Sequence, residues 1–145
     1  ATNLEHVGDI AENVSDQVAK KIRRRMQFSP EGLADIEALH TRVSSNLSLA
    51  LATFMSGDVK LARQLLREKR SVNAMERSSA GAHLARLVEG RPESIETSAM
   101  HMDILRDLKR IHSHIVAGAY PVLALAGELP NGEVDIVQPT PAVNG

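Results

Sequence analysis

Apolar residues recur every three or four positions along most of the chain, which is the spacing of one face of an α-helix. A first stripe of this kind consists of Leu4, Val7, Ala11, Val14, Val18, Ile22 and Met26. A second consists of Ile36, Leu39, Val43, Leu47, Ala50 and Phe54. No segment alternates apolar and polar residues in the manner of a β-strand, so the pattern predicts an all-α fold.

Turn residues mark where the predicted helices begin and end. In the segment FSPEG, Ser29 suits the N-cap of a second helix, and Pro30 suits its first position, where a missing N–H costs nothing. In SGD, Gly57 suits the left-handed position after a helix, and Asp58 can cap the next one. Because this turn is so short, we expect the second and third helices to form an antiparallel pair.

The segment EGRPES separates the third and fourth helices, and its Gly90 and Pro92 repeat the same stop-and-start chemistry. The fourth helix should continue to about Ala126, with its last turns kinked or weakened by Pro121. Helices of about 30 residues are roughly 45 Å long, which predicts an elongated antiparallel bundle of about four long helices. We expect this bundle to occupy residues 1–127 and residues 128–145, which have turn residues and no period, to form a flexible tail.

Composition narrows the class of protein. The 145 residues suffice for one domain, and 43% hydrophobic but only 2% aromatic residues suit a core of packed helices. A net charge of -1 gives no overall field that would favour nucleic acid or anionic lipid. The absence of Cys removes disulfides, thiolate metal sites and cysteine nucleophiles, and it fits a reducing compartment.

The chain shows no signal peptide and no obvious membrane span. Its most continuous apolar run, residues 115–127, contains Pro121 and is shorter than the ~20 residues that a span needs. The sequence begins at Ala1, already inside a helical pattern and without a clear start signal. We therefore expect it to be a piece of a longer protein.

Acidic residues near the chain start form the first candidate site. Glu5 and Asp9 are four apart, so both would lie on one side of a helix and could reach one hard cation. Two carboxylates alone hold a metal poorly, and a second helix would have to supply more ligands. The alternative, which we favour, is a solvated acidic face near a helix N-terminus, where the macrodipole stabilises negative charge.

A second candidate is the segment EALH, in which Glu37 and His40 have the Glu-x-x-His spacing of di-iron helical bundles. Such bundles need that motif on two helices. The five other histidines have no Glu three residues before them: His6, His83, His101, His112 and His114. A chance pairing is therefore favoured, and since no serine, histidine and acid arrangement stands out, we do not expect an enzyme.

The segment KKIRRR is the strongest basic cluster, with cations at Lys20, Lys21, Arg23, Arg24 and Arg25. It falls in the last turns of the first helix, where positive charge complements the helix dipole. That structural role is the favoured interpretation. The alternative is contact with phosphate groups of a lipid or a ligand, and nucleic acid is less favoured because aromatic residues for stacking are almost absent.

The segment LEHVGDIAENV resembles the signature helix of PhoU-like domains, whose pattern is approximately L-E-R-I-x-D-x-x-x-N. Leu4, Glu5, Val7, Asp9 and Asn13 carry the pattern, and His6 replaces the usual Arg. The later segment DLKRIHSHIVAGAYPVL resembles the matching helix of a second repeat. The whole is most similar to the cytoplasmic PhoU-like domain at the C-terminus of bacterial sodium/phosphate cotransporters, from Ala1 to about Leu125.

The resemblance implies a fold of two three-helix repeats. Residues 1–28 would be the last helix of repeat one, and residues 29–127 would be repeat two. Two earlier helices and, in the transporter, the membrane spans would lie upstream. The first helix should then expose an apolar stripe unless the other helices or another copy of the chain cover it.

The resemblance also bears on metals, because PhoU-type proteins can bind metal clusters through acid-x-x-x-acid motifs. Glu5 and Asp9 keep one such pair, as a half-site for a divalent, iron or zinc ion at most. In repeat two the corresponding positions hold Lys69, Asn73, Lys109 and Ser113. Since an ammonium repels a cation, we expect repeat two to have lost its site, and otherwise expect no cofactor.

The function implied is a non-enzymatic regulatory or structural domain of a sodium-dependent phosphate transporter, concerned with phosphate uptake or homeostasis. It would lie at the cytoplasmic side of the inner membrane and contact the transmembrane part of its parent protein or a phosphate transporter, with homo-oligomers possible and no nucleic acid bound. One alternative is a free-standing cytoplasmic PhoU-type regulator of phosphate import and signalling. Another, from a different class, is a metal-carboxylate enzyme.

Overall fold

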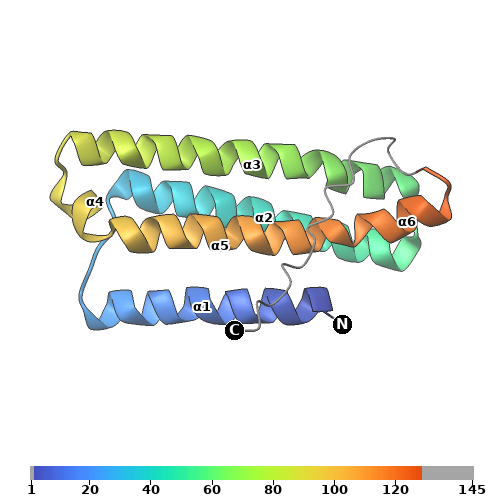
Figure 1. The fold of residues 1–145 in the computed structure, drawn as a ribbon, viewed down its shortest axis with the longest axis horizontal. Coiled ribbons are helices and arrows are strands. Elements are labelled where there is room, and N and C mark those ends of the chain that lie inside the picture. Colours follow the sequence, from blue (N-terminus) through green and yellow to red (C-terminus); the bar gives the residue numbers. More distant parts are fainter. Residues whose placement is uncertain (1, 129–145) are drawn as a thin grey trace, which may run out of the picture.

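The computed structural model describes residues 2–128, without the side chains of residues 2–4 and 7, and shows long helices side by side (Figure 1). The helices are α1 (Thr2–Arg23), α2 (Pro30–Ser56), α3 (Val59–Val88), α4 (Pro92–Glu96), α5 (Ser98–Ala117) and α6 (Ala119–Leu125). The predicted all-α, elongated bundle is therefore confirmed for the described residues. Almost all of the tail predicted for 128–145 lies outside them.

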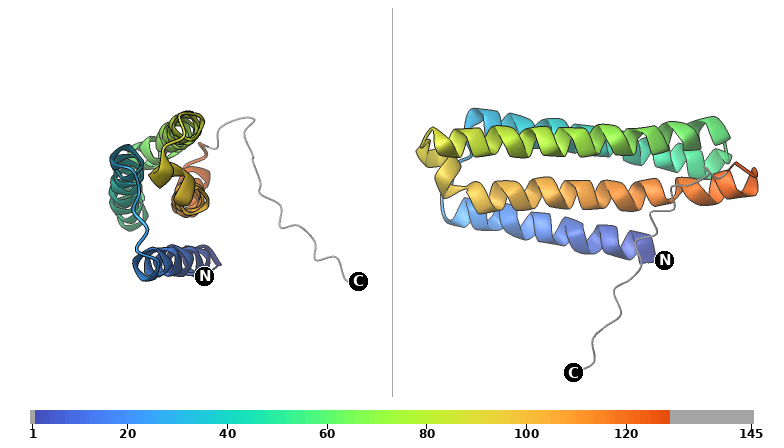
Figure 2. Two further views of the ribbon diagram at one scale, coloured as in Figure 1. Left: turned by 90° about the vertical axis from the view of Figure 1, so that its left-hand side faces the viewer. Right: turned by 45° about the horizontal axis from the view of Figure 1, so that its top comes forward.

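Helices α2, α3 and α5 form an antiparallel three-helix bundle, and α6 continues the line of α5 (Figure 1). Helix α1 lies at one side of this bundle and packs on α5, as the end-on view of Figure 2 shows. None of the helices within residues 2–128 combines the length and the apolar character that a membrane span requires.

The capping predictions are confirmed. The Oγ of Ser29 accepts the N–H of Gly32 at 3.1 Å, and Pro30 begins α2. Helix α2 ends at Gly57, which has a φ of 65°. The Oδ1 of Asp58 then accepts two backbone N–H groups of the first turn of α3, at 2.7 and 3.3 Å. The resulting turn makes α2 and α3 antiparallel, as expected.

The predicted fourth helix is divided into α4, α5 and α6. The expected weakening near Pro121 is present, but the break between α5 and α6 lies at Gly118. The N–H of Gly118 donates to the carbonyl of Ile115 at 3.2 Å. Pro121 has no N–H to donate to Ala117, one turn earlier, so the helix loses a hydrogen bond at that point. The earlier break at Thr97, where φ is -100° and ψ is 5°, was not predicted.

The core lies between α2, α3, α5 and α6, and its fully buried side chains include Leu39, Leu65, Val72, Leu105, Val116 and Leu123. The apolar stripe predicted for α2 is partly wrong. Leu47 and Phe54 are 44% and 79% exposed, whereas Asn46 and Thr53 are buried. The polar pair can be buried because each has a partner: the Thr53 hydroxyl donates to the carbonyl of Leu49 at 2.8 Å, and Asn46 reaches across to α3 and α5.

Helix α1 also turns a different face inward from the one predicted. It buries Ile10, which is 2% exposed and was not in the predicted stripe. Val18 and Ile22, which were in the stripe, are 43% and 70% exposed. Because α1 packs mainly on the single helix α5, its apolar stripe is wider than the face that α5 can cover. The expectation that this stripe is left exposed unless something else covers it therefore holds for Val18 and Ile22.

Candidate functional site

The predicted acidic half-site lies on an exposed face of α1. Glu5 and Asp9 are both exposed, and between them His6 stacks its ring on that of His114 of α5, with centroids 5.0 Å apart. Burial lowers the pKa of His114, and the neighbouring charge of His6 lowers it further. Within residues 2–128, the described side chains include no group of three or more His, Cys, Asp or Glu that could hold a metal. Glu5 and Asp9 therefore stay a predicted half-site.

The four repeat-two positions lie on two helices that pack on each other, Lys69 and Asn73 on α3 and Lys109 and Ser113 on α5. The Nζ of Lys109 forms an ion pair with Oε2 of Glu76 at 3.1 Å. The Ser113 hydroxyl donates to the carbonyl of Lys109, also at 3.1 Å. Lys69 and Asn73 are half-buried on α3. An ammonium that already neutralises a carboxylate leaves no anionic ligand, so these positions do not fit a metal.

Among the described residues, the fold brings no further metal ligands to the Glu-x-x-His pair. Glu37 and His40 are both exposed on α2. No second Glu-x-x-His pair faces them in the described part of the chain. The di-iron interpretation therefore receives no support.

A partly buried polar network, which the apolar pattern of the sequence did not predict, joins three helices. Arg42 of α2 forms two hydrogen bonds with Glu68 of α3, at 2.7 and 3.2 Å, and a third with Ser71 at 3.2 Å. The Nδ2 of Asn46 donates to Glu68 at 3.2 Å and to Nε2 of His112 at 2.9 Å. We call these residues the Glu68 network. Burial of His112 lowers its pKa to about 4, so its ring is neutral and accepts the Asn46 hydrogen bond.

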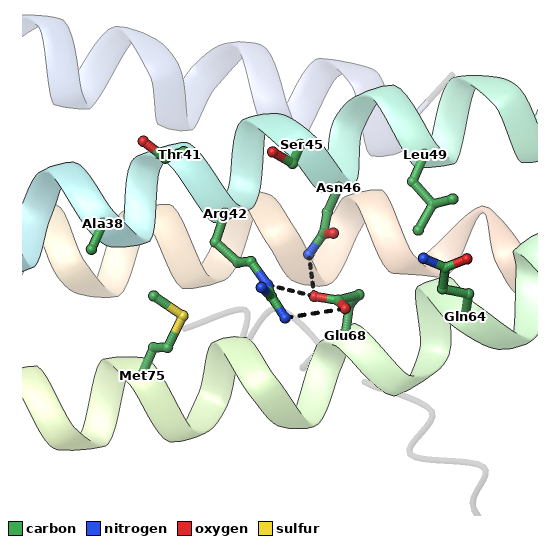
Figure 3. A pocket seen from close by; sticks show the side chains of 9 residues that line it. All are labelled: Ala38, Thr41, Arg42, Ser45, Asn46, Leu49, Gln64, Glu68 and Met75. Carbon is green, nitrogen blue, oxygen red and sulfur yellow. Dashed lines mark hydrogen bonds and ion pairs between the residues drawn. The ribbon is translucent and has the colours of Figure 1, made fainter.

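A groove between α2 and α3 has a volume of about 440 Å³, and Arg42, Asn46 and Glu68 of the Glu68 network are among the residues that line it. Figure 3 shows Arg42 and Asn46 on α2 pointing toward Glu68 on α3 at its centre. The guanidinium and the carboxylate neutralise each other there in a two-point contact. The groove thus offers a ligand mainly hydroxyl, amide and apolar groups, with Thr41, Ser45, Gln64, Leu49 and Met75 on its walls.

A second missed cluster lies at the end of the bundle where α2 begins and α3 ends. The rings of His83 and His101 are 4.5 Å apart by centroid, and Ser98 Oγ lies 2.9 Å from Nε2 of His83. Arg86 is buried beside them and forms an ion pair with Asp35 at 3.0 Å. Burial, together with the charges of His83 and Arg86, lowers the pKa of His101 to about 4.

The signal for this second cluster was present in the spacing of α3. Val72, Ser79, His83 and Arg86 follow one another at helical intervals on the buried face. Because most of these residues are polar, the buried face does not appear as an apolar stripe in the sequence. In the described part of the chain, four buried side-chain atoms have no hydrogen-bond partner, and all belong to this region: Nδ1 of His83, Nε of Arg86, Oγ of Ser94 and Nε2 of His101.

The predicted basic cluster lies at the C-terminal end of α1. Lys20, Arg23, Arg24 and Arg25 are exposed and form no ion pair with any described residue. Lys21 is half-buried, with its Nζ 5.3 Å from the ring centroid of Phe28. The structure thus gathers the predicted cations at one helix end.

Comparison with known proteins identifies the family of this helical bundle. Residues 36–121, from α2 to α6, match the sequence model of the family described as the PhoU domain. The chain belongs to the PhoU domain family. Helix α1 lies outside the matched range, although it carries the segment that resembles the PhoU signature helix.

Full-length relatives are much longer than this PhoU-domain chain. The putative inorganic phosphate export protein YjbB of Salmonella typhimurium is 42% identical over 124 residues, which are 85% of this chain and 23% of that protein. The protein of the same name from Escherichia coli K12 is 40% identical over 122 residues, 83% of this chain and 22% of its own length. The chain therefore spans less than a quarter of these relatives. No solved structure matches it.

Proposed function

We propose that the chain is a non-enzymatic regulatory or structural domain of a sodium-dependent phosphate transporter. It would act at the cytoplasmic side of the inner membrane by packing against the membrane part of the same protein. The observation that carries the proposal is the 42% identity, over 85% of the chain, to a protein named for putative inorganic phosphate export. The name of this relative describes export, whereas the resemblance implied uptake or homeostasis. The proposal therefore covers phosphate movement in either direction.

The length difference supports a place inside a larger protein. The matched segment is 23% of the Salmonella relative, so most of that protein lies outside it and has room for a membrane part. On this proposal, residues 1–28 are the last helix of a first repeat whose other helices come from the rest of the protein.

The exposed apolar side chains support the same proposal. Val18 and Ile22 are exposed on α1, and α2 exposes Leu47, Leu51, Phe54 and Met55 by 44% to 85%. The four α2 residues are spaced so that they lie on one side of the helix. An exposed apolar helix face is typical of a surface that packs on another protein segment. The proposed occupants are helices of the parent protein, with a second copy of the chain as the other choice.

A variant pair tests whether the apolar face of α2 matters for transport. Leu51→Glu with Phe54→Glu, made in the parent protein, places two charges on this face. We expect a lower flux of radiolabelled phosphate while the protein stays in the membrane. The matched control is Leu84→Glu with Val88→Glu on α3, which are 58% and 90% exposed and should leave the flux unchanged. Unchanged flux in both directions for both pairs, and for deletion of the whole domain, would contradict the proposal.

The second candidate function is a free-standing PhoU-type regulator, which the family match supports equally well. The gene upstream of the Ala1 codon separates the two. Several apolar stretches of about 20 residues would favour the transporter domain. Two amphipathic helices and no such stretch would favour the free regulator. Stoichiometric iron, zinc or manganese that is lost on Asp9→Asn would instead support a metal-dependent role.

A further inference from the structure

The basic cluster is more than a helix end stabilised by cations. The helix dipole accounts for positive charge in the last turn, and Lys20, Lys21 and Arg23 already supply it. Arg24 and Arg25 lie beyond the last residue of α1 and are also exposed. The dipole therefore does not explain all five cations.

The backbone at Arg25 gives the second observation. Its φ of 53° places it in the left-handed region, and it is the only non-glycine residue with a positive φ in the described part of the chain. The N–H of Met26 donates to the carbonyl of Lys21, and that of Arg25 to Ile22, both at 3.1 Å. This is the hydrogen-bond pattern of a Schellman motif, whose left-handed position glycine adopts without steric cost.

Three other helix ends in the described part of the chain show the usual solution. Gly57, Gly90 and Gly127 follow α2, α3 and α6, with φ of 65°, 73° and 70°. Among the described helices, α1 alone ends on a strained arginine. A side chain kept at a conformational cost points to a role for that side chain.

We propose that the basic cluster is a surface that binds anionic lipid headgroups. Lys20, Arg23, Arg24 and Arg25 present charges that no described carboxylate neutralises, and guanidinium groups match phosphate oxygens in two-point contacts. Ile22 is 70% exposed in the middle of the cluster, and Val18 is 43% exposed one turn earlier. Basic residues flanking exposed apolar ones are the combination that lies in a membrane interface.

The inference stands apart from the proposed function, because it rests on charge, exposure and backbone conformation alone. The net charge of the chain is -1, so binding would depend on this local cluster and not on an overall positive field. Attraction to an anionic membrane surface falls off within a Debye length, which makes the location of the charges decisive.

Sedimentation with phosphatidylcholine vesicles, with and without phosphatidylglycerol, tests the proposal. The unchanged chain should sediment only with the vesicles that contain phosphatidylglycerol. The triple variant Lys20→Gln, Arg23→Gln, Arg24→Gln should bind about 100-fold more weakly, at about fivefold for each charge. Lys21 is kept because it packs on Phe28.

The matched control removes three exposed cations from α3 that form no ion pair with a described residue, through Arg67→Gln, Arg70→Gln and Arg77→Gln. It has the same net charge as the test variant and should bind vesicles like the unchanged chain. Circular dichroism of each variant establishes that its helices are intact. Equal loss of binding in the control would overturn the proposal, because it would mean that attraction is not confined to the cluster.

Arg25→Gly separates a lipid-binding role from a purely structural one. Glycine should relieve the left-handed strain, so the unfolding midpoint in urea should rise. Vesicle binding should fall about fivefold. A more stable variant that binds as tightly as before would overturn the role of Arg25 and, with it, the argument from strain.

Two competition experiments address other anions. Inorganic phosphate and sulfate at equal ionic strength should release the chain from vesicles equally. Release by phosphate alone would overturn the proposal in favour of a free-phosphate site. Tighter binding to a short RNA duplex than to vesicles would overturn it in favour of a nucleic-acid surface, and no binding of the unchanged chain to any vesicle would also overturn it.

Discussion

The Nδ2 of Asn46 lies 2.9 Å from the Nε2 of His112, and both side chains are buried. Because an amide nitrogen only donates, the histidine nitrogen must accept, which places the ring proton on Nδ1. A protonated ring would present two N–H groups and lose this contact. The pair therefore fixes both the tautomer of His112 and the register between α2 and α5.

A double-mutant cycle on this pair should show strong coupling. Asn46→Leu leaves the buried Nε2 of His112 without a donor, and His112→Leu leaves the amide with only Glu68, so each should cost about 1–3 kcal/mol of unfolding free energy. The double variant should cost less than the sum, since neither partner is then left unpaired. Urea unfolding of the four proteins measures this, and additive costs would mean that the hydrogen bond contributes little.

The stability of the chain should fall in mild acid. The pKa values of His101 and His112 are lowered from 6.5 to about 4, mainly by burial. Between these values the unfolded chain binds more protons than the folded one, so acid favours unfolding. The contribution of the two neutral rings to the free energy of unfolding should be fully present above pH 6.5. It should fall as the pH drops toward 4, by about 3 kcal/mol for each ring. Urea midpoints measured across this range of pH check the prediction.

Two substitutions show whether the histidines are responsible. His112→Gln should reduce the number of protons taken up on unfolding by about one near pH 5. His40→Gln replaces an exposed ring and serves as the matched control. If His112→Gln keeps the full acid sensitivity, other groups must cause it.

Local chemistry made much of the fold predictable. The caps at Ser29, Gly57 and Asp58 act through hydrogen bonds and backbone angles within three or four residues, and each was found where expected. The helices and their antiparallel order followed from these turns. By contrast, the break at Thr97 has no Gly or Pro at that residue to mark it.

What could not be predicted depends on partners far along the chain. Asn46 and His112 are 66 residues apart, and burial of either makes sense only once the other is placed. Helix α1 buries Ile10 because of where α5 lies, although its own apolar stripe is centred elsewhere. For the candidate sites, the structure locates Glu5, Asp9 and the basic cluster, and binding at each stays a prediction.

The ion pair between Arg86 and Asp35 should matter far more than the one between Arg91 and Glu31. The side chain of Arg86 is 8% exposed, so Asp35→Ala would leave a buried charge without its partner. We expect a loss of about 3–5 kcal/mol in unfolding free energy. Arg91 and Glu31 are 42% and 51% exposed, and Glu31→Ala should change the stability little. Equal urea midpoints for the two variants would contradict this ranking.

Two glycines in helices should respond in opposite ways to alanine. A Cβ at Gly32 would lie 3.0 Å from Oγ of Ser29 and 3.1 Å from Nδ1 of His101. Ser29 is held as the N-cap of α2, and the His101 ring packs between Phe28 and His83, so neither can move away easily. Gly32→Ala should therefore destabilise the protein by about 1–2 kcal/mol.

The comparison position is Gly81, which is exposed in α3 and where a Cβ would have no neighbouring atom within 4 Å. Gly81→Ala should stabilise the protein by about 0.5–1 kcal/mol, because alanine loses less backbone freedom in a helix. Thermal or urea unfolding of both variants measures the sign of the change in stability for each. A stabilising Gly32→Ala would show that the Ser29 and His101 side chains can shift, and that the end of the bundle around His83 and His101 is looser than its packing indicates.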